Sequence, residues 1–507
     1  MEKRRIGNVC LSLLIVVAIG VGIFQHSGLN WNSLFRDENG EPVFGIISPV
    51  TKVVINDLSK AFDIILENGT KEFYNGYPID DSFLHWINHR FGESAVMDIA
   101  YGVYEGFVEK ELWYTYTGNS MHVLWLVYCK DLGYATYQLE NVHWQECASQ
   151  DVVTIDFTGD INLADDWHTM LAASQKQNSV YDCISEDISK ELQSADISVV
   201  NNEFVFSDGG DRQENKAYTF RAKTSNILFL NIFGADLANL ANNHTYDFRA
   251  SGLLDTIDTL NNYGIATMGA GENLAAAKAI QYYIANGKKI AFVAATEIER
   301  YSNYTKEATE TEAGVLKTLN PTIYNQVIAE AKANSDYVIA SVHWGTEGTY
   351  NYSGYQYNLA KGFVDAGADA IIGGHPHRLQ GIEYINGVPV CYSLGNFWFS
   401  TGTLYTTIAQ IQIDDEGELK LRMIPCIQKD LTTSILEGEE AVNFYKFMAD
   451  ISKNIVIDKE GFIYNTSNGN NSHLKNGENY QSGKQYGRYN GSYDLEGRAI
   501  DIVGNLR

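Results

Sequence analysis

The sequence VVTIDFTGDIN, residues 152–162, decides how the central part of this chain folds. Its apolar and β-branched start is typical of a buried strand, and a turn that carries Asp160 follows directly. Helix-like stretches at residues 251–263 and 355–366 lie farther along the chain. They alternate with four more apolar segments that we predict to be strands, at residues 197–200, 289–295, 336–342 and 369–374. Alternation of this kind predicts a layered α/β domain over residues 151–430.

Five buried segments of this domain are followed by residues that can bind a metal ion. The five loops are TGDIN at 158–162, NNE at 201–203, ANNHTYD at 241–247, HWGTE at 343–347 and HPH at 375–377. Each loop taken alone is more often a turn, a helix cap or part of a core. Sites in open α/β sheets form at the carboxyl ends of strands, so the joint occurrence of the five loops favours one shared crevice.

The residue types in these loops indicate a particular chemistry. Asp, Glu, Asn and His supply oxygen and imidazole ligands that suit Mn²⁺, Fe²⁺ or Zn²⁺. Cysteine is absent from all five loops, which argues against a structural zinc site. The two histidines of HPH can reach different ions, and a bridging carboxylate can hold two metals about 3.5–4 Å apart. The sequence therefore predicts a site for one or two divalent metal ions.

The ordered set of motifs, together with YSLGNF at 392–397, resembles the CapA family of poly-γ-glutamate capsule biosynthesis proteins. The resemblance covers residues 152–400 and extends to stretches between the motifs, for example 253–271 and 363–370. It implies a calcineurin-like metallophosphoesterase fold. It also implies six metal ligands, namely Asp160, Glu203, Asn243, His343, His375 and His377.

The resemblance also implies a role for each of these residues. Glu203 would bridge two metals, while Asp160 and His377 would complete the first metal site. The second metal would be completed by Asn243, His343 and His375. His244 would face the substrate as a catalytic residue, and Asp247 would orient the His244 imidazole.

Four arginines near the motifs are candidates for binding an anionic substrate. Arg221 and Arg378 are the predicted substrate-binding residues, and Arg212 and Arg249 are further candidates. Equally, these arginines can be surface residues that pair with nearby carboxylates.

Composition and charge exclude several classes of protein. The chain has 507 residues and a formal net charge of −26, from 63 Asp and Glu against 37 Lys and Arg. A surface that binds nucleic acid needs an excess of basic residues, so we expect no nucleic-acid partner. The 6 cysteines form no CxxC or other tight pair, which argues against a zinc ribbon and a small disulfide scaffold.

The first 35 residues predict a membrane anchor. Basic residues at 3–5 precede an apolar run at 9–24, and residues 7–35 contain no charged side chain. The basic flank should stay in the cytoplasm, which places the bulk of the chain outside the cell membrane in a single-pass arrangement. A cleaved signal peptide is the competing interpretation, but no convincing small-x-small cleavage site follows the run.

Two further segments flank the α/β domain. Residues 36–150 predict a small membrane-proximal α+β module of unknown function, in which residues 121–129 (MHVLWLVYC) read as a buried strand. This segment also contains His85 and His89, to which we assign no role. Residues 431–507 predict a C-terminal helix and a flexible extension, rich in Asn, Gly and Tyr from residue 460 onward.

Two functions of different classes remain open from the sequence. In the first, the chain is an assembly subunit in the synthesis and export of poly-γ-glutamate or a related anionic polymer. Its partners would be the polymer, membrane subunits of the export complex and the lipid bilayer. In the second, it is a metal-dependent hydrolase of phosphoester or γ-glutamyl amide bonds. Asn162 stands where typical phosphoesterases keep a ligand histidine, which weakens one metal position and favours the assembly role.

Overall fold

A computed structural model describes residues 81–467 except 93, 105–106, 108, 132–140, 146 and 300–303, and also three short strands at 479–481, 492–493 and 499–500. The predicted anchor at residues 1–35 lies outside the described residues. Among the residues that are described, no helix combines the length and the hydropathy needed to cross a bilayer.

The first of two large sheets has seven strands, which are β1 (Val142–Gln145), β9 (Gln281–Ala285), β10 (Lys288–Thr296), β12 (Tyr337–His343), β13 (Ala370–Gly374), β14 (Leu379–Ile385) and β15 (Val388–Leu394). They lie in the order β1-β9-β10-β12-β13-β15-β14, and β10, β12, β13 and β15 run parallel to one another. Three of the predicted strands are confirmed here as β10, β12 and β13.

The second large sheet contains the segment that opens the α/β domain. Its strands are β2 (Val152–Ile161), β3 (Ile197–Asn202), β6 (Leu237–Asn239), β7 (Ala266–Met268), β16 (Asn396–Trp398), β17 (Leu404–Asp414), β18 (Leu419–Lys429), β19 (Thr432–Ile435), β20 (Ile455–Asp458), β21 (Phe462–Asn465) and β22 (Asn479–Gln481). The main order is β22-β20-β21-β18-β17-β2-β3-β6-β7, with β16 beside β2 and β19 beside β18. β2, β3, β6 and β7 run parallel, which confirms the predicted strands at 152–157 and 197–200.

The two sheets share a hydrophobic core between their facing surfaces. Phe157 of β2 and Phe292 of β10 both lie in this core, with their ring centroids 6.4 Å apart. The neighbours of Phe292 in sequence, Ala291 and Val293, pack on the opposite face of the seven-stranded sheet. Because successive side chains of a strand point to opposite faces, a strand covered on both sides must be apolar at nearly every position.

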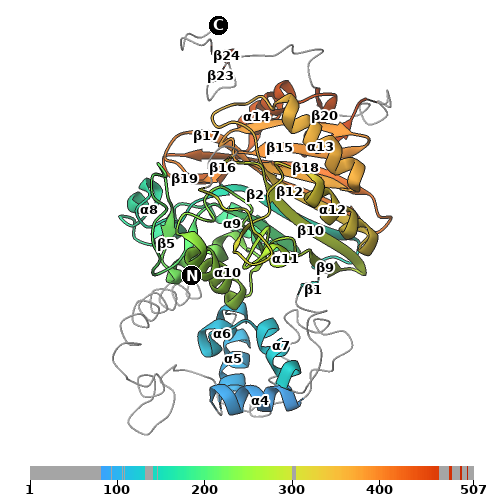
Figure 1. The fold of residues 1–507 in the computed structure, drawn as a ribbon. Coiled ribbons are helices and arrows are strands. Elements are labelled where there is room, and N and C mark those ends of the chain that lie inside the picture. Colours follow the sequence, from blue (N-terminus) through green and yellow to red (C-terminus); the bar gives the residue numbers. More distant parts are fainter. Residues whose placement is uncertain are drawn as a thin grey trace, which may run out of the picture. The chain divides into compact units, whose positions relative to one another are not determined.

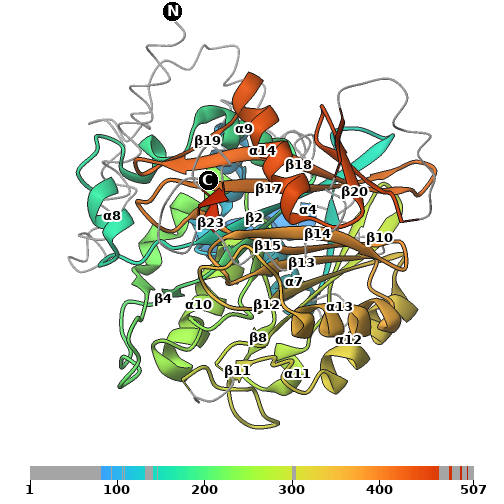
Figure 2. The same ribbon diagram turned by 90° about the horizontal axis from the view of Figure 1, so that it is seen from above.

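Helices cover the outer faces of both sheets. Helices α12 (Thr322–Asn334) and α13 (Gly354–Ala366) pack on the seven-stranded sheet. Helix α9 (Glu186–Ser194), the 3₁₀ helix η3 (Thr224–Phe233) and helix α10 (Arg249–Tyr263) pack on the other sheet. The resulting order of layers is helix, sheet, sheet, helix (Figure 1 and Figure 2). It confirms the predicted α/β class and the predicted helices at 251–263 and 355–366.

The segment before the α/β domain forms helices α4 (Asp81–Phe91), α5 (Ala95–Tyr104), α6 (Glu109–Thr117) and α7 (Met121–Asp131). The strand predicted at 121–129 is therefore wrong. Met121, Leu124, Trp125 and Tyr128 are buried, a spacing that marks one face of a helix. The sequence does not show this helical spacing, because residues 121–129 are apolar at nearly every position. A short apolar run does not distinguish a buried strand from a buried helix.

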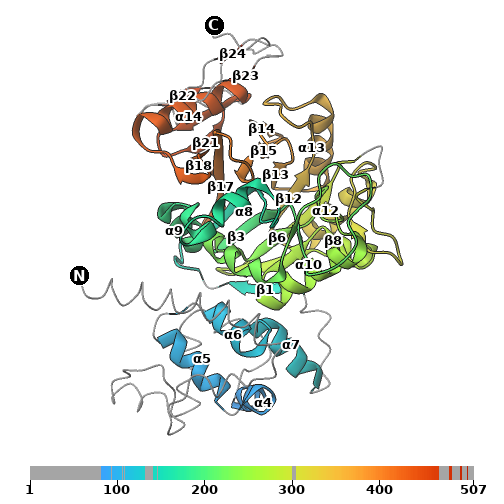
Figure 3. The ribbon, with the colours of Figure 1, turned by 90° about the vertical axis from the view of Figure 1, so that its left-hand side faces the viewer.

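The two ends of the α/β domain differ from the predicted boundaries. β1 lies within residues 36–150, yet it pairs in parallel with β9 of the seven-stranded sheet. At the other end, the predicted C-terminal helix is present as α14 (Gly438–Ile451). Part of the predicted extension belongs to the second sheet, because β21 pairs with β18 and β22 pairs with β20. Figure 3 shows α14 beside these strands.

Candidate metal centre

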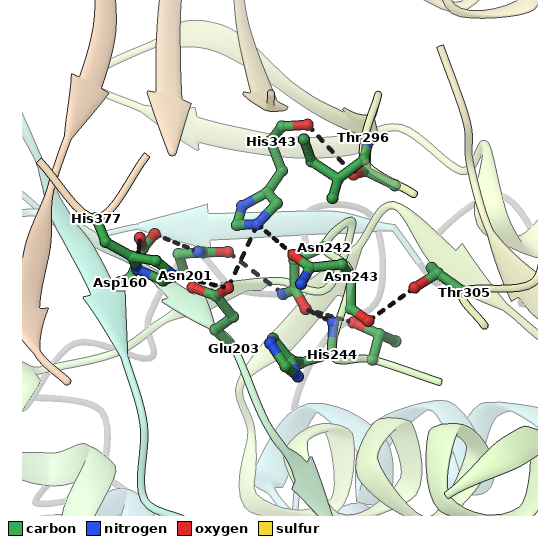
Figure 4. A network of polar contacts seen from close by, with 12 residues as sticks. Asp160, Asn201, Glu203, Asn242, Asn243, His244, Thr296, Thr305, His343 and His377 are labelled. Atoms are coloured by element: carbon green, nitrogen blue, oxygen red, sulfur yellow. Dashed lines mark hydrogen bonds and ion pairs between the residues drawn. The ribbon is translucent and has the colours of Figure 1, made fainter. Parts of the chain in front are cut away.

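The candidate site lies where strands of both large sheets end. Asp160 is near the end of β2, and Glu203 follows β3 directly, so both come from the second sheet. His343 is the last residue of β12 in the seven-stranded sheet. Asn243 and the two histidines of HPH lie in loops after β6 and β13. Figure 4 shows the side chains of Glu203, Asn243 and His343 pointing toward one another.

All six predicted metal ligands come together. Three groups of side chains each place one ligand atom per residue within 4.8 Å of the others. The groups are Glu203 with His343 and His375, Asp160 with Glu203 and His377, and Glu347 with His375 and His377. Asn243 joins the first group, because His343 Nε2 lies 2.8 Å from Asn243 Oδ1. Glu203 belongs to two groups, as a bridging carboxylate would.

Glu203 shows most clearly that these residues fit a cation. Its side chain is fully buried, and neither carboxylate oxygen accepts a hydrogen bond. Two imidazole nitrogens approach Oε1, His343 Nε2 at 3.4 Å and His377 Nε2 at 3.9 Å. A buried carboxylate without hydrogen bonds is costly unless a positive charge compensates it. The donor set of carboxylates, amide and imidazoles is one that divalent transition metals accept.

Without a metal ion, at least one titratable side chain of the site is protonated at neutral pH. Burial, with the nearby Asp160 carboxylate, raises the pKa of Glu203 well above its usual range. Burial by itself lowers the pKa of His377, but the carboxylates of Glu203 and Asp160 outweigh burial and raise this pKa to about 9. Burial also lowers the pKa of His343, to about 3. His377 therefore carries the positive charge that a metal ion would replace.

The backbone around HPH is shaped for this cluster. His375 and His377 have positive φ angles of 95° and 53°, a conformation that residues other than glycine rarely adopt. The residue before them is Gly374, where an added Cβ would lie only 3.0 Å from Asp160 Oδ1 and 3.4 Å from His343 Nδ1. A side chain at position 374 would therefore crowd two of the predicted ligands.

His244 and Asp247 form a buried pair beside the metal ligands, as predicted. His244 Nδ1 donates to Asp247 Oδ2 at 2.7 Å, which leaves Nε2 as the other reactive nitrogen. Burial lowers the pKa of His244, although Asp247 opposes the shift. The second oxygen of Asp247 forms a 2.8 Å ion pair with Lys216, whose ammonium also lies 3.1 Å from Glu299. Lys216 was not predicted as a site residue, because it lies in a polar loop without a recognisable motif.

Three further residues support the cluster and were not predicted as site residues. Asn201 donates to Asp160 Oδ1 at 2.7 Å, and His377 Nδ1 donates to Asn396 Oδ1 at 2.7 Å. Both asparagines lie inside motifs that the sequence analysis had already recognised, NNE and YSLGNF. Glu347 is the last residue of HWGTE and joins the third ligand group. Position within a motif was the signal that could have identified them.

Asn162 and three of the four candidate arginines form contacts within the protein. Asn162 Oδ1 accepts a hydrogen bond from the Ala164 amide at 2.8 Å, so it stabilises the turn after β2. Arg221 donates to the carbonyl of Gly209 and stacks on a phenylalanine ring, and Arg378 donates to the carbonyl of His377. Arg249 forms an exposed ion pair, as the alternative interpretation of the arginines expects. Substrate binding by Arg221 and Arg378 stays a prediction.

The fold and the site define an α/β protein with a histidine and carboxylate centre of the kind that holds divalent metals. The family model for the bacterial capsule synthesis protein PGA_cap matches residues 154–401. The PGA biosynthesis protein CapA of Bacillus subtilis (strain 168) is 31% identical over 282 residues, which are 55% of this chain and 72% of that protein. The chain therefore belongs to this capsule synthesis family, which confirms the predicted CapA resemblance.

Other similarities are more limited. The capsule biosynthesis protein CapA of Bacillus anthracis is 34% identical over 221 residues, which are 42% of this chain and 53% of that protein. The crystal structure of the 5'-nucleotidase from Candida albicans SC5314 covers 55% of this chain and 53% of its own, at 12% identity. Its TM-score of 0.32 is too low to carry any statement about this chain.

Proposed function

We propose that this chain acts in the biosynthesis of poly-γ-glutamate or a related anionic polymer, and that its site binds one or two divalent metal ions. Relatives named for PGA and capsule biosynthesis support the first part. The buried Glu203 carboxylate, which accepts no hydrogen bond and lies beside two histidines, supports the second. The calcineurin-like fold, the dinuclear arrangement and the choice among Mn²⁺, Fe²⁺ and Zn²⁺ belong to the same proposal.

The proposed ligands divide between two positions that share Glu203. Asp160 and His377 would hold one ion, and Asn243, His343 and His375 the other. Bound metal would supply a Lewis acid that polarises a phosphoryl or carbonyl oxygen. Asn201 and Asn396 would keep Asp160 and His377 oriented, since each forms a 2.7 Å hydrogen bond to one of them.

Hydrolysis is the second candidate function, and the His244–Asp247 pair favours it. An imidazole held by a buried carboxylate can stabilise charge or transfer a proton at its other nitrogen. Lys216 forms an ion pair with the other oxygen of the same carboxylate, so Asp247 is held from two sides. An assembly subunit does not need such an arrangement beside its metal ligands.

The metal proposal is tested by element analysis of the purified full-length protein. Replacing His375 and His377 together by Ala should remove most of the bound metal. The matched control is the double variant of His85 and His89, two exposed histidines on α4, which should keep the full metal content. Equal metal content in the two double variants would refute the proposed ligand set.

The two candidate functions are separated by His244→Ala. A strain that lacks this protein is complemented with the variant at equal abundance, and the surface polymer is measured. Loss of polymer or altered chain length, with unchanged metal content, supports chemistry at the site, since removing such a group typically costs about 10²–10³-fold in rate. Polymer indistinguishable from the wild type would exclude the hydrolase and leave the assembly role.

We also propose that the bulk of the chain is extracellular and held by the N-terminal segment. The support is the order of basic residues at 3–5 followed by an apolar run at 9–24. Protease added to intact protoplasts should digest the α/β domain. Full protection of the domain in intact protoplasts, with digestion after lysis, would refute this topology.

A further inference from the structure

Lys317 is a buried cation that the proposed metal centre does not use. Only 6% of the residue is exposed, and burial lowers the pKa of its ammonium. Among residues 81–467 as described, none forms an ion pair or a side-chain hydrogen bond with Lys317. Lys216, by contrast, is paired with Asp247 and Glu299. The ammonium nitrogen keeps some contact with solvent although most of the side chain is buried, so it can meet an anionic ligand.

The register of the sheet places Lys317 on the same face as a predicted metal ligand. Lys317 forms a parallel bridge with Thr296, and Thr296 is paired with His343 across β10 and β12. Residues in register on neighbouring strands project their side chains to the same face. Two strand spacings separate the backbones of Lys317 and His343 by about 10 Å. Figure 4 shows Thr296 hydrogen-bonded to the His343 carbonyl.

The packing of Leu316, the residue before Lys317, agrees with this direction of the Lys317 side chain. Leu316 belongs to the core beneath α12 and α13, on the outer face of the seven-stranded sheet. Because side chains alternate along an extended chain, Lys317 projects to the opposite face, where the candidate metal centre lies.

One charged neighbour of Lys317, Lys216, also contacts a predicted metal ligand. The charge of Lys216 is close enough to lower the pKa of Lys317 in addition to burial, while Glu299 and Glu307 oppose the shift. Lys216 itself donates to the carbonyl of Asn243, a predicted metal ligand. Glu299 is already engaged by Lys216 and by the Thr305 amide, so it does not neutralise Lys317 by direct contact.

We propose that Lys317 binds an oxyanion of the substrate, a phosphate or a carboxylate, beside the metal centre. The inference rests on the proposed function, because the anion would belong to the ligand that meets the metal. The chain carries a net charge of −26, so an anionic substrate needs a local cation rather than attraction by the whole surface. Lys317 meets this need better than Arg221 and Arg378, whose guanidinium groups bind backbone carbonyls.

The test compares Lys317→Met with Lys278→Met in the full-length protein. Lys278 is exposed, so its replacement makes the same change in net charge away from the site. The measurements are melting temperature, Mn²⁺ content, and the affinities for inorganic phosphate and for a short γ-linked glutamate oligomer, each with and without Mn²⁺. Lys317→Met should keep its Mn²⁺ and bind at least one anion about 10- to 100-fold more weakly. Lys317→Arg should restore part of the binding.

The outcomes separate this inference from the metal proposal. Selective loss of phosphate or of glutamate binding identifies the anion and supports the inference. If Lys317→Met binds both anions as tightly as the wild type, the inference is overturned, whether or not the variant is less stable. Mn²⁺ binding by the protein would in that case still support the metal proposal. If Mn²⁺ does not bind but phosphate binding still depends on Lys317, the metal proposal fails and the inference stands.

Discussion

Metal binding should displace a proton from His377, and the metal affinity should therefore rise with pH up to about 9. With a pKa of about 9, His377 is about 99% protonated at pH 7 in the metal-free protein. Each pH unit between 6.5 and 8.5 should then strengthen the apparent affinity roughly tenfold, or ~1.4 kcal/mol, with a slightly smaller gain toward pH 8.5. An ordinary histidine, with a pKa near 6.5, would give almost no dependence above pH 7.5.

The assay is calorimetric titration of the full-length protein with Mn²⁺ at several pH values. Repeating the titration at pH 7.5 in buffers of different ionisation enthalpy counts the protons released for each ion bound. We expect about one proton for each ion bound, because the raised pKa of His377 keeps its imidazole protonated until the metal binds.

His343 provides the control for this experiment. Its pKa is lowered to about 3 by burial, so it is neutral before the metal arrives and releases no proton. His343→Gln should weaken Mn²⁺ binding and leave the number of released protons unchanged. A wild-type affinity that is flat between pH 7.5 and 8.5, with heats that do not depend on the buffer, would refute the charge arrangement derived for the site.

Three further predictions follow from other features of the structure. Burial raises the pKa of Asp156 to about 8, so the folded protein keeps this carboxyl protonated at a pH where the unfolded chain ionises it. The free energy of unfolding therefore falls by ~1.4 kcal/mol for each pH unit between the unfolded pKa and about 8. Asp156→Asn removes this loss, so it should stabilise the protein by a few kcal/mol at pH 7.5 and give no gain at pH 4. Urea unfolding at both pH values measures this, with the exposed Asp151→Asn as control. Gly374→Ala should weaken Mn²⁺ binding without unfolding the protein, whereas Gly354→Ala, where an added Cβ meets nothing within 4 Å, should not. Chelation of divalent metal should lower the melting temperature of the wild type, and a melting temperature insensitive to chelator would contradict metal binding to the folded state.

Much of the site could be predicted because its residues follow buried strands. In a parallel strand covered on both faces, almost every side chain is apolar, so a polar cluster at the end stands out in the sequence. The residues Asp160, Glu203 and His343 were identified in this way. Helix α7 shows where such reasoning fails, since its apolar run gives the same local signal as a strand, and only packing decides between them.

The sequence by itself determined which residues could bind metal and that they lie at strand ends, because both properties are local. The tertiary structure decided that loops from two different sheets meet, since no local pattern says which strands share a sheet. It also decided the charge of the site, because the pKa of His377 depends on carboxylates from β2 and from the turn after β3. The roles of Lys216 and Lys317 likewise required the fold. A lysine in a polar segment looks like a surface residue until neighbouring strands and loops bury it.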